Sequence, residues 1–306
     1  MTPVLQTRHL AWLTMTLFMV ALPVHAVASK KAKVDEPLVR SGSALVFDEQ
    51  SAEVLYSRES DVAVPIASIS KLMTALVVLE AQQPADEIIK ITEDDKDFEK
   101  YTKSRLKVGS KLSRDDLLHL ALMSSENRAA HALARNYPGG IVECVQAMNL
   151  KAKELGMTHT HFVEPTGLSS DNVASPEDLS KLVMEASKND VISEYSTDEY
   201  HTLRVGRQPM TFHNTDLLVR KSDWNIIVQK TGYIAEAGKC LVMKTIIAGR
   251  SVVIVLLDSV GKYTRVADAR RIRKWMEAKI RSSINLAGTN PMLTETSAAL
   301  AMPSVQ

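Results

Sequence analysis

Three short motifs along the chain carry side chains that can perform chemistry. The first reads Ser-Ile-Ser-Lys, from Ser68 to Lys71, so a hydroxyl and an amine lie three positions apart. On an α-helix such positions are separated by about 60° around the axis, which predicts that both side chains share a face. A serine becomes a strong nucleophile when a base takes its proton. Lys71 can be that base if burial lowers its pKa, and its apolar neighbours Ile66, Leu72 and Met73 favour burial.

The spacing of Ser68 and Lys71 is not specific by itself. Ser104 and Lys107 are also three positions apart, but they lie in a charged, turn-like stretch followed by Gly109, where nothing would desolvate a lysine. Either pair, taken alone, is consistent with a solvated lysine on an ordinary helix. Whether the first pair is functional therefore depends on other motifs in the chain.

The second and third motifs supply groups that complement a nucleophile. Ser125 and Asn127 follow an apolar run at a predicted helix-helix junction, where the serine could relay a proton and the amide could orient a substrate backbone. Lys230, Thr231 and Gly232 end a β-branched run, where a cation and a hydroxyl can bind a carboxylate. The glycine is expected to keep the strand face open for an extended substrate. Taken alone, the second motif would more often be an ordinary polar turn, and the third would more often be a strand end followed by a turn.

The elements that must position these motifs follow from hydrophobic periodicity and turn residues. The predicted elements are two short strands in 43–58, helices over 66–80, 113–135 (in two pieces that meet near Ser124 and Ser125), 141–156, 175–189 and 267–284, and three antiparallel strands in 224–259. Segment 86–100 reads as a solvated surface stretch and 160–175 as an irregular loop. Strands at both ends with helices between them predict one α/β domain of the α+β type, with the terminal strands joined in a single antiparallel sheet.

Composition and the N-terminus indicate an exported globular protein. The chain has 306 residues, of which 45% are hydrophobic and 24% charged, and its net charge of +1 gives no reason to expect nucleic-acid binding. Residues 1–26 combine Arg8, a short apolar run and a small residue at Ala26, which is typical of a signal peptide cleaved after Ala26. An uncleaved N-terminal anchor is the alternative. We expect a periplasmic protein with a mobile lead-in over 27–39, a domain over 40–285 and a disordered tail over 286–306, and no transmembrane anchor after processing.

Cysteines and histidines give no metal-binding pattern. Cys144 and Cys240 allow at most one disulfide, and the sequence leaves their pairing open. The eight histidines include no His-Glu-x-x-His, and His159 with His161 reads as a polar loop pair. We expect neither a metal nor a cofactor.

Together and in this order, the three motifs resemble those of the penicillin-recognising serine peptidases. The chain resembles the low-molecular-mass penicillin-binding proteins, which are D-alanyl-D-alanine peptidases of peptidoglycan, over roughly residues 40–285. The likeness includes VFDEQSAEVLYSR (46–58), FVEPTGLSSDNVASPEDLSKL (162–182) and the strands after Lys230. It implies the β-lactamase/DD-peptidase-like fold with a helical subdomain. The literal Ser170-Asp171-Asn172 is interpreted as a coincidence.

The resemblance implies acyl transfer. Ser68 would attack a D-alanine carbonyl with Lys71 as base, and Ser125, near Lys230, would pass a proton to the leaving amine. The backbone N–H groups of Ser68 and Tyr233 would form the oxyanion hole. β-Lactams would be covalent inhibitors.

The same resemblance implies a substrate-binding set around the nucleophile. Asn127 and Thr231 would hold the peptide, with Gly232 and Tyr233 alongside them. Arg265, shortly after the last strand, would help to bind a carboxylate, or is an ordinary surface arginine.

Within this group the chain most resembles the D-alanyl-D-alanine endopeptidases. Tyr233-Ile234 stands where many carboxypeptidase relatives have histidine-threonine, and Asn214-Thr215-Asp216 lacks the basic residue that some relatives carry before the Leu-Leu pair. We also expect no further β-rich domain and no C-terminal amphipathic anchor. A D-alanyl-D-alanine carboxypeptidase is the main alternative. A class A β-lactamase that uses Glu164 and a non-catalytic wall-binding protein are the others.

Overall fold

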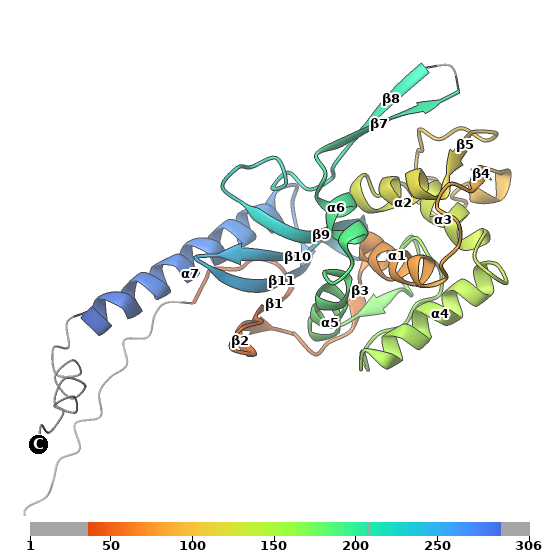
Figure 1. Ribbon diagram of the computed structural model, residues 1–306. Helices are drawn as coiled ribbons and strands as arrows, with labels where there is room; N and C mark the ends of the chain where they lie inside the picture. The colour runs from red at the N-terminus through yellow and green to blue at the C-terminus, as the bar shows by residue number, and fades with distance from the viewer. Residues whose placement is uncertain (1–35, 207, 289–306) are drawn as a thin grey trace, which may run out of the picture. The chain divides into compact units, whose positions relative to one another are not determined.

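The computed structural model describes residues 36–206 and 208–288, and side chains up to Ser282 (Figure 1). The predicted signal peptide, most of the lead-in and most of the tail lie outside these residues. No helix in the described part of the chain is both long and apolar enough to cross a bilayer.

A five-stranded antiparallel sheet, in the order β2-β1-β11-β10-β9, forms the centre of the molecule. Its strands are β1 (Ser43–Asp48), β2 (Glu53–Arg58), β9 (Asn225–Ile234), β10 (Gly238–Ile247) and β11 (Arg250–Ser259). The prediction that strands from both ends share one sheet is confirmed, because β1 pairs directly with β11.

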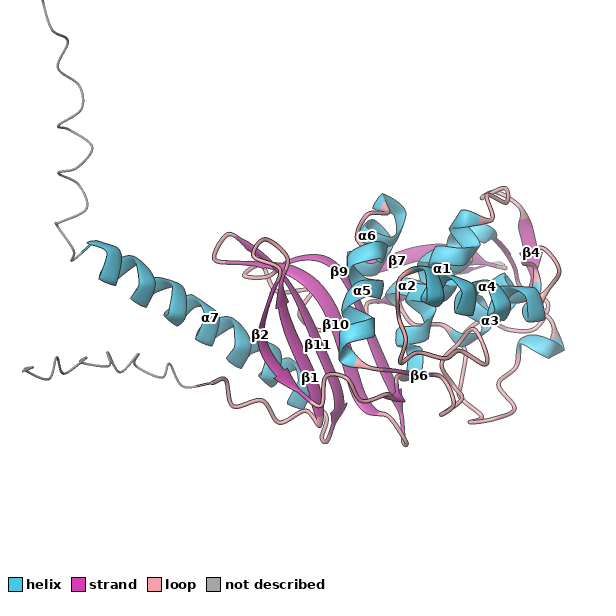
Figure 2. Ribbon diagram, turned by 90° about the horizontal axis from the view of Figure 1, so that it is seen from below, coloured by secondary structure: helices cyan, strands magenta, loops and turns pink. Residues whose placement is uncertain are grey.

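Both faces of this sheet are covered, as the residues of β11 show. Val253, Val255 and Leu257 belong to the larger apolar core, while the intervening Val252 and Ile254 belong to a second core on the other face. Side chains alternate between the faces of a strand, so a run of β-branched residues serves both cores at once. Figure 2 shows the two layers, with α5 and α6 on one side of the sheet and α7 on the other.

Nine helical segments accompany the sheet in the described residues. They are η1 (Ala67–Ile69), α1 (Ser70–Glu80), η2 (Glu93–Asp95), α2 (Arg114–Met123), α3 (Asn127–Arg135), α4 (Ile141–Glu154), α5 (Pro176–Ala186), α6 (Asp190–Thr197) and α7 (Thr264–Gly288). The two-piece prediction for 113–135 is confirmed, with the junction at Ser124 and Ser125. In α1 every residue from Ser70 to Val78 is buried, including the polar Ser70, Lys71 and Thr74, so this helix lies at the centre of the core.

The helix α7 covers the second face and corrects one predicted boundary. Val266, Ala269, Ile272 and Met276 form its buried stripe against the sheet. The helix continues to Gly288, so the first three residues of the expected disordered tail are helical.

One segment that the sequence predicted to be mobile and one that it predicted to be solvated are partly packed. Val39, in the expected mobile lead-in, is buried in the second core. In the charged segment 86–100, Ile89, Ile91 and Asp95 are buried. The many charged residues of this segment hid the short strand over 88–90, in which only Ile89 is buried.

Three small two-stranded sheets and α6 were not predicted. The pairs are β3 (Val64–Pro65) with β6 (Val173–Ala174), β4 (Ile88–Lys90) with β5 (Lys111–Ser113), and β7 (Tyr200–Val205) with β8 (Gln208–His213). The β7–β8 hairpin projects from the rest of the chain (Figure 1). It buries few side chains, so its sequence lacks the alternation that identifies a strand.

The two cysteines are free. Cys144 lies in α4 and Cys240 in β10, and both are buried. Burial raises the pKa of both thiols to about 12, so they act as small apolar core residues.

Candidate active site

Ser68 and Lys71 lie where a 3-10 turn runs into α1. Ser68 is in η1 rather than in the α-helix itself, so the predicted helix over 66–80 starts with a tighter turn. The preceding Ala67 has a φ of 50°, a left-handed conformation that is costly for a residue with a side chain. The predicted contact nevertheless forms, with 2.9 Å between Lys71 Nζ and Ser68 Oγ.

Lys71 is fully buried and has two further oxygen partners. Its Nζ lies 2.7 Å from Asn127 Oδ1 and 2.5 Å from the Thr166 carbonyl oxygen. Burial lowers the pKa of Lys71 to about 8, and the carboxylates of Glu164 and Glu126 oppose that shift. A neutral amine has two hydrogens and one lone pair. Because Asn127 Oδ1 and the Thr166 carbonyl can only accept hydrogen bonds, they take both hydrogens and leave the lone pair for the Ser68 hydroxyl.

The second motif forms the sharp turn between α2 and α3. Ser125 has a φ of 58°, which lets the N–H groups of Ser124 and Glu126 both reach the Leu120 carbonyl. Asn127 then starts α3, and its Nδ2 donates to Thr102 Oγ1 at 3.0 Å. The side chain of Asn127 is therefore held at both ends, which the sequence did not predict.

The third motif brings a second buried amine to the same site. Lys230, on β9, is fully buried, and its Nζ lies 3.1 Å from the Thr231 carbonyl oxygen. Burial, followed by the charges of Lys71 and Arg265, holds the pKa of Lys230 well below its ordinary value. Thr231 Oγ1 is 2.6 Å from Thr215 Oγ1.

The reason for glycine at position 232 differs from the expected one. A Cβ on Gly232 would lie 2.9 Å from the Ile66 carbonyl oxygen and 3.1 Å from the Ser68 amide nitrogen. The strand face is thus covered by the segment that carries Ser68, and glycine permits this close approach. Gly167 approaches from another side, because its Cβ would lie 1.9 Å from the Ala67 carbonyl oxygen.

Tyr233, on β9, and Arg265, on α7, are two further candidate site residues. The side chain of Tyr233 is 59% exposed, and Lys239 Nζ is 3.6 Å from the centre of its ring. Arg265 is in the first turn of α7, and its buried Nη1 makes no hydrogen bond with the described residues. Burial lowers the pKa of Arg265, and the charge of Asp216 opposes this.

A loop that the sequence left irregular holds the carbonyl that contacts Lys71. The Glu164 carboxylate accepts from the N–H groups of Thr166 and Gly167 at 2.6 and 2.5 Å. Asn172 is buried and donates to Ser70 Oγ at 3.0 Å, and also to Glu164. Asn172 is thus a structural residue, and Glu164 is committed to fixing the carbonyl that contacts Lys71. This disfavours a role for Glu164 in activating water.

Two proteins with related sequences are both named D-alanyl-D-alanine endopeptidase. This chain is 48% identical to a D-alanyl-D-alanine endopeptidase of Pseudomonas aeruginosa, covering 86% of both chains. It is 46% identical to a D-alanyl-D-alanine endopeptidase of Escherichia coli, covering 85% of this chain and 86% of the relative.

Solved structures confirm the predicted β-lactamase/DD-peptidase-like fold. The Streptomyces K15 DD-transpeptidase superposes with a TM-score of 0.73 at 27% identity, covering 79% of this chain and 98% of that one. Penicillin-binding protein D2 of Listeria monocytogenes, in its cefotaxime-bound form, gives a TM-score of 0.70 at 27% identity with the same coverage. The family described as D-alanyl-D-alanine carboxypeptidase matches residues 30–261. The chain therefore belongs to the D-alanyl-D-alanine carboxypeptidase family of serine peptidases.

Proposed function

We propose that this protein is a periplasmic DD-endopeptidase that hydrolyses D-alanyl cross-links of peptidoglycan through an acyl-enzyme on Ser68. The observation that carries the proposal is the fully buried Lys71, with its Nζ 2.9 Å from Ser68 Oγ and its pKa lowered to about 8. A buried amine next to a serine can accept the hydroxyl proton near neutral pH, which an exposed lysine cannot do efficiently.

In the proposed acylation step, Ser68 Oγ attacks the carbonyl carbon of the D-alanine while Lys71 Nζ takes the proton. The backbone N–H groups of Ser68 and Tyr233 stabilise the oxyanion. Collapse of this intermediate breaks the C–N bond. Ser125, assisted by Lys230, passes a proton to the leaving amine, and the proton that Lys71 took from Ser68 replaces the one that Ser125 gives. Water then attacks the acyl-enzyme and frees Ser68.

Four further residues are proposed to hold the substrate. Asn127 and Thr231 bind the peptide, with Tyr233 next to it, and Arg265 attracts a carboxylate. Gly232 contributes indirectly, because it allows the Ser68 segment to pack against β9. β-Lactams are proposed to acylate Ser68 by the same attack.

Cleavage of internal bonds is favoured over removal of a terminal residue by the surroundings of Arg265. A carboxypeptidase must attract a free terminal carboxylate, and the nearby Asp216 carries a charge that opposes this attraction. The two relatives at 48% and 46% identity are also named endopeptidases. A carboxypeptidase is the second candidate, because more distant relatives such as that of Bacillus subtilis, at 28% identity, carry that name.

The proposal is tested by digesting two purified muropeptides, a cross-linked dimer and a pentapeptide monomer. The mature protein, starting after Ala26, is compared with Ser68→Ala and with Ser57→Ala, an exposed serine on β2, as the matched control. We expect the dimer to be split by the wild type and by Ser57→Ala but not by Ser68→Ala. Release of terminal D-alanine only would establish the carboxypeptidase instead.

A further inference from the structure

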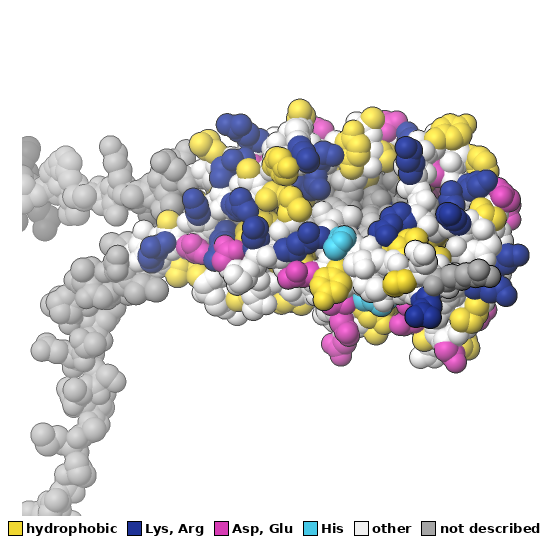
Figure 3. Space-filling model, turned by 90° about the horizontal axis from the view of Figure 1, so that it is seen from above, with side chains coloured by type: hydrophobic (Ala, Val, Ile, Leu, Met, Phe, Trp, Pro, Cys, Tyr) yellow, Lys and Arg dark blue, Asp and Glu magenta, His cyan; other side chains and the backbone are white. Residues whose placement is uncertain are grey.

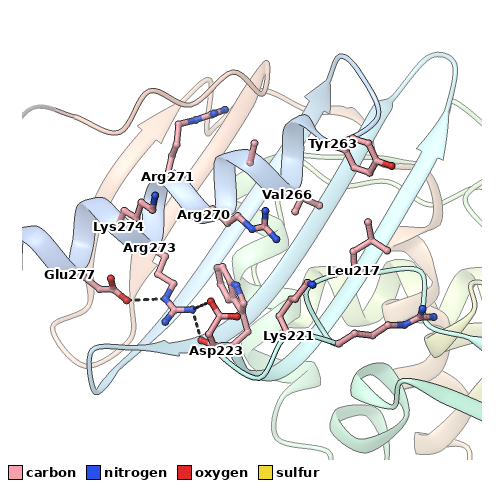
Figure 4. Close-up of a pocket in the computed structure, with 13 residues that line it drawn as sticks. Leu217, Lys221, Asp223, Tyr263, Val266, Arg270, Arg271, Arg273, Lys274 and Glu277 are labelled. Atoms are coloured by element: carbon pink, nitrogen blue, oxygen red, sulfur yellow. Dashed lines mark hydrogen bonds and ion pairs between the residues drawn. The ribbon is translucent and has the colours of Figure 1, made fainter.

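A depression in the surface, apart from the candidate active site, lies between α7 and the loop 217–224 that leads into β9 (Figure 4). It has a volume of about 740 Å³. Leu217, Trp224 and Val266 contribute apolar surface to it, and we call it the α7 trough. Figure 3 shows that Lys and Arg side chains gather on this part of the surface, over α7 and its surroundings.

The α7 trough concentrates positive charge in a chain whose net charge is only +1. Six basic and two acidic side chains line it. Both acids, Asp223 and Glu277, pair with Arg273, and Arg271 pairs with Asp268 outside the trough. The remaining basic side chains, all exposed, make no ion pair with the described residues. They are Arg220, Lys221, Arg270 and Lys274.

These unpaired cations lie on both sides of the trough. Arg270 and Lys274 are one helical turn apart on α7, and Figure 4 shows Arg270 and Lys221 pointing toward each other from the helix and the loop. Like charges that converge repel each other in the absence of an anion between them. The arrangement therefore favours a ligand with several negative groups that lies along the trough.

The trough is linked to the active site by two elements. The connection between β8 and β9 carries Thr215, in contact with Thr231, and continues into the trough at Leu217. The helix α7 carries Arg265, and at 1.5 Å and about 100° per residue Arg270 and Lys274 lie about 7.5 and 13.5 Å further along its axis, on the side of the helix turned away from Arg265. An extended peptide covers the axial part of this path with roughly four residues.

We propose that the α7 trough binds carboxylates of the peptidoglycan peptides at a position remote from the bond that is cut. This inference builds on the proposed function, since it assigns a second contact with the same substrate. Peptidoglycan peptides are extended and carry several carboxylates, which matches a concave surface with cations on both sides. A flat anionic membrane would contact the rim of such a trough rather than its interior.

The test is co-sedimentation with purified sacculi, with Ser68→Ala as the background so that the polymer stays intact. The trough variant is Lys221→Gln/Arg270→Gln/Lys274→Gln. The matched control is Lys107→Gln/Lys111→Gln/Arg204→Gln, which removes three cations around a different depression. At low salt we expect the bound fraction of the trough variant to be at least about fivefold lower than that of its parent, and the control to bind like the parent. Binding of the parent is expected to fall as the salt concentration rises.

A second measurement needs no variant. Sacculi whose carboxylates have been amidated with carbodiimide and ammonia are expected to lose most of their binding to the parent protein. Equal binding to native and amidated sacculi, or equal binding by trough and control variants, overturns the inference. Binding to vesicles that contain phosphatidylglycerol is measured for comparison. If the trough variant loses binding to these vesicles but not to sacculi, the inference is also overturned, and the surface is assigned to a membrane.

Failure of this inference is distinguishable from failure of the proposed function. In the wild-type Ser68 background, the trough variant is expected to be acylated by penicillin at a rate within about twofold of the wild type, because penicillin offers no extended peptide that reaches the trough. If the wild type itself does not cut the soluble muropeptide dimer, the proposed endopeptidase activity is rejected, whatever the binding to sacculi shows.

Discussion

The lysines of the active site and those of the α7 trough lie in opposite surroundings. Lys71 and Lys230 are completely buried, and burial lowers the pKa of both. Lys221 and Lys274 are exposed and hydrated. The same side chain is thus suited to accept a proton in one region and to act as a fixed positive charge in the other, because desolvation disfavours the ammonium form.

The largest expected effect tests whether Lys71 must lose its proton. Lys71→Arg keeps the positive charge but cannot act as a base near neutral pH, so penicillin acylation of Ser68 is expected to fall by about 10²–10⁴-fold. The measurement is the acylation rate by mass spectrometry. Lys107→Arg, in the unused Ser-x-x-Lys spacing, is the control and is expected to react normally. A Lys71→Arg protein that acylates at the wild-type rate would contradict the assignment of the base.

The pH dependence of acylation sharpens the comparison next. The ammonium form of Lys71 cannot accept a proton, so the rate is expected to rise with pH and to level off above a midpoint of about 8. Because the charge of Glu126 raises the pKa of Lys71, Glu126→Gln is expected to move the midpoint to lower pH. A rate independent of pH between 6 and 9 would argue against a neutral lysine base.

Close packing of the buried region predicts the effect of Gly232→Ala. The added Cβ would press on Ile66 and Ser68, which is expected to cost about 1–3 kcal/mol in the free energy of unfolding and roughly 10²-fold in acylation rate. Gly249→Ala is the control, since its Cβ would meet open space at a φ of 81°. It should lower the melting temperature through backbone strain while acylation stays unchanged. If Gly232→Ala is acylated at the normal rate, the segment that carries Ile66 and Ser68 can shift to make room for the added Cβ.

Asp216 is expected to have a smaller effect, on the preference for dimer cleavage over release of terminal D-alanine. Asp216→Asn removes the charge that opposes attraction of a carboxylate to Arg265, so release of terminal D-alanine relative to dimer cleavage is expected to rise roughly fivefold, about 1 kcal/mol. The ratio of the two products is measured by chromatography. Asp223→Asn, which removes an exposed acid that pairs with Arg273, should leave the ratio as it is. An unchanged ratio in Asp216→Asn would remove Asp216 from the account of specificity.

The smallest expected effect belongs to the exposed region. Lys274→Gln is expected to change neither the activation free energy of acylation nor the free energy of unfolding by more than about 0.5 kcal/mol, because the side chain is solvated. A clear loss of acylation would break the comparison, since it would mean that the trough acts on the chemistry itself.

Much of the fold could be predicted from the chain because the pattern is strong where burial is extensive. The β-branched runs of β9 to β11 serve two cores and were recognisable as strands. The β7–β8 hairpin and the buried positions of 86–100 were not, because so few of their side chains face the core. Of the candidate site, the motifs identified residue types and their order, and the structure places Lys71 in direct contact with both Ser68 and Asn127.

By itself, the sequence determined which groups are available: a serine, two lysines and their apolar neighbours, at spacings that fix the local turn around Ser68 and Lys71. Only the tertiary structure decided how these groups are held. Asn127 reaches Lys71 across 56 positions of the chain and the Thr166 carbonyl does so across 95, while Gly232 and Gly167 matter because other segments pack against them. The physical reason is that desolvation and close approach depend on what surrounds a residue in space, and local sequence fixes only its immediate neighbours.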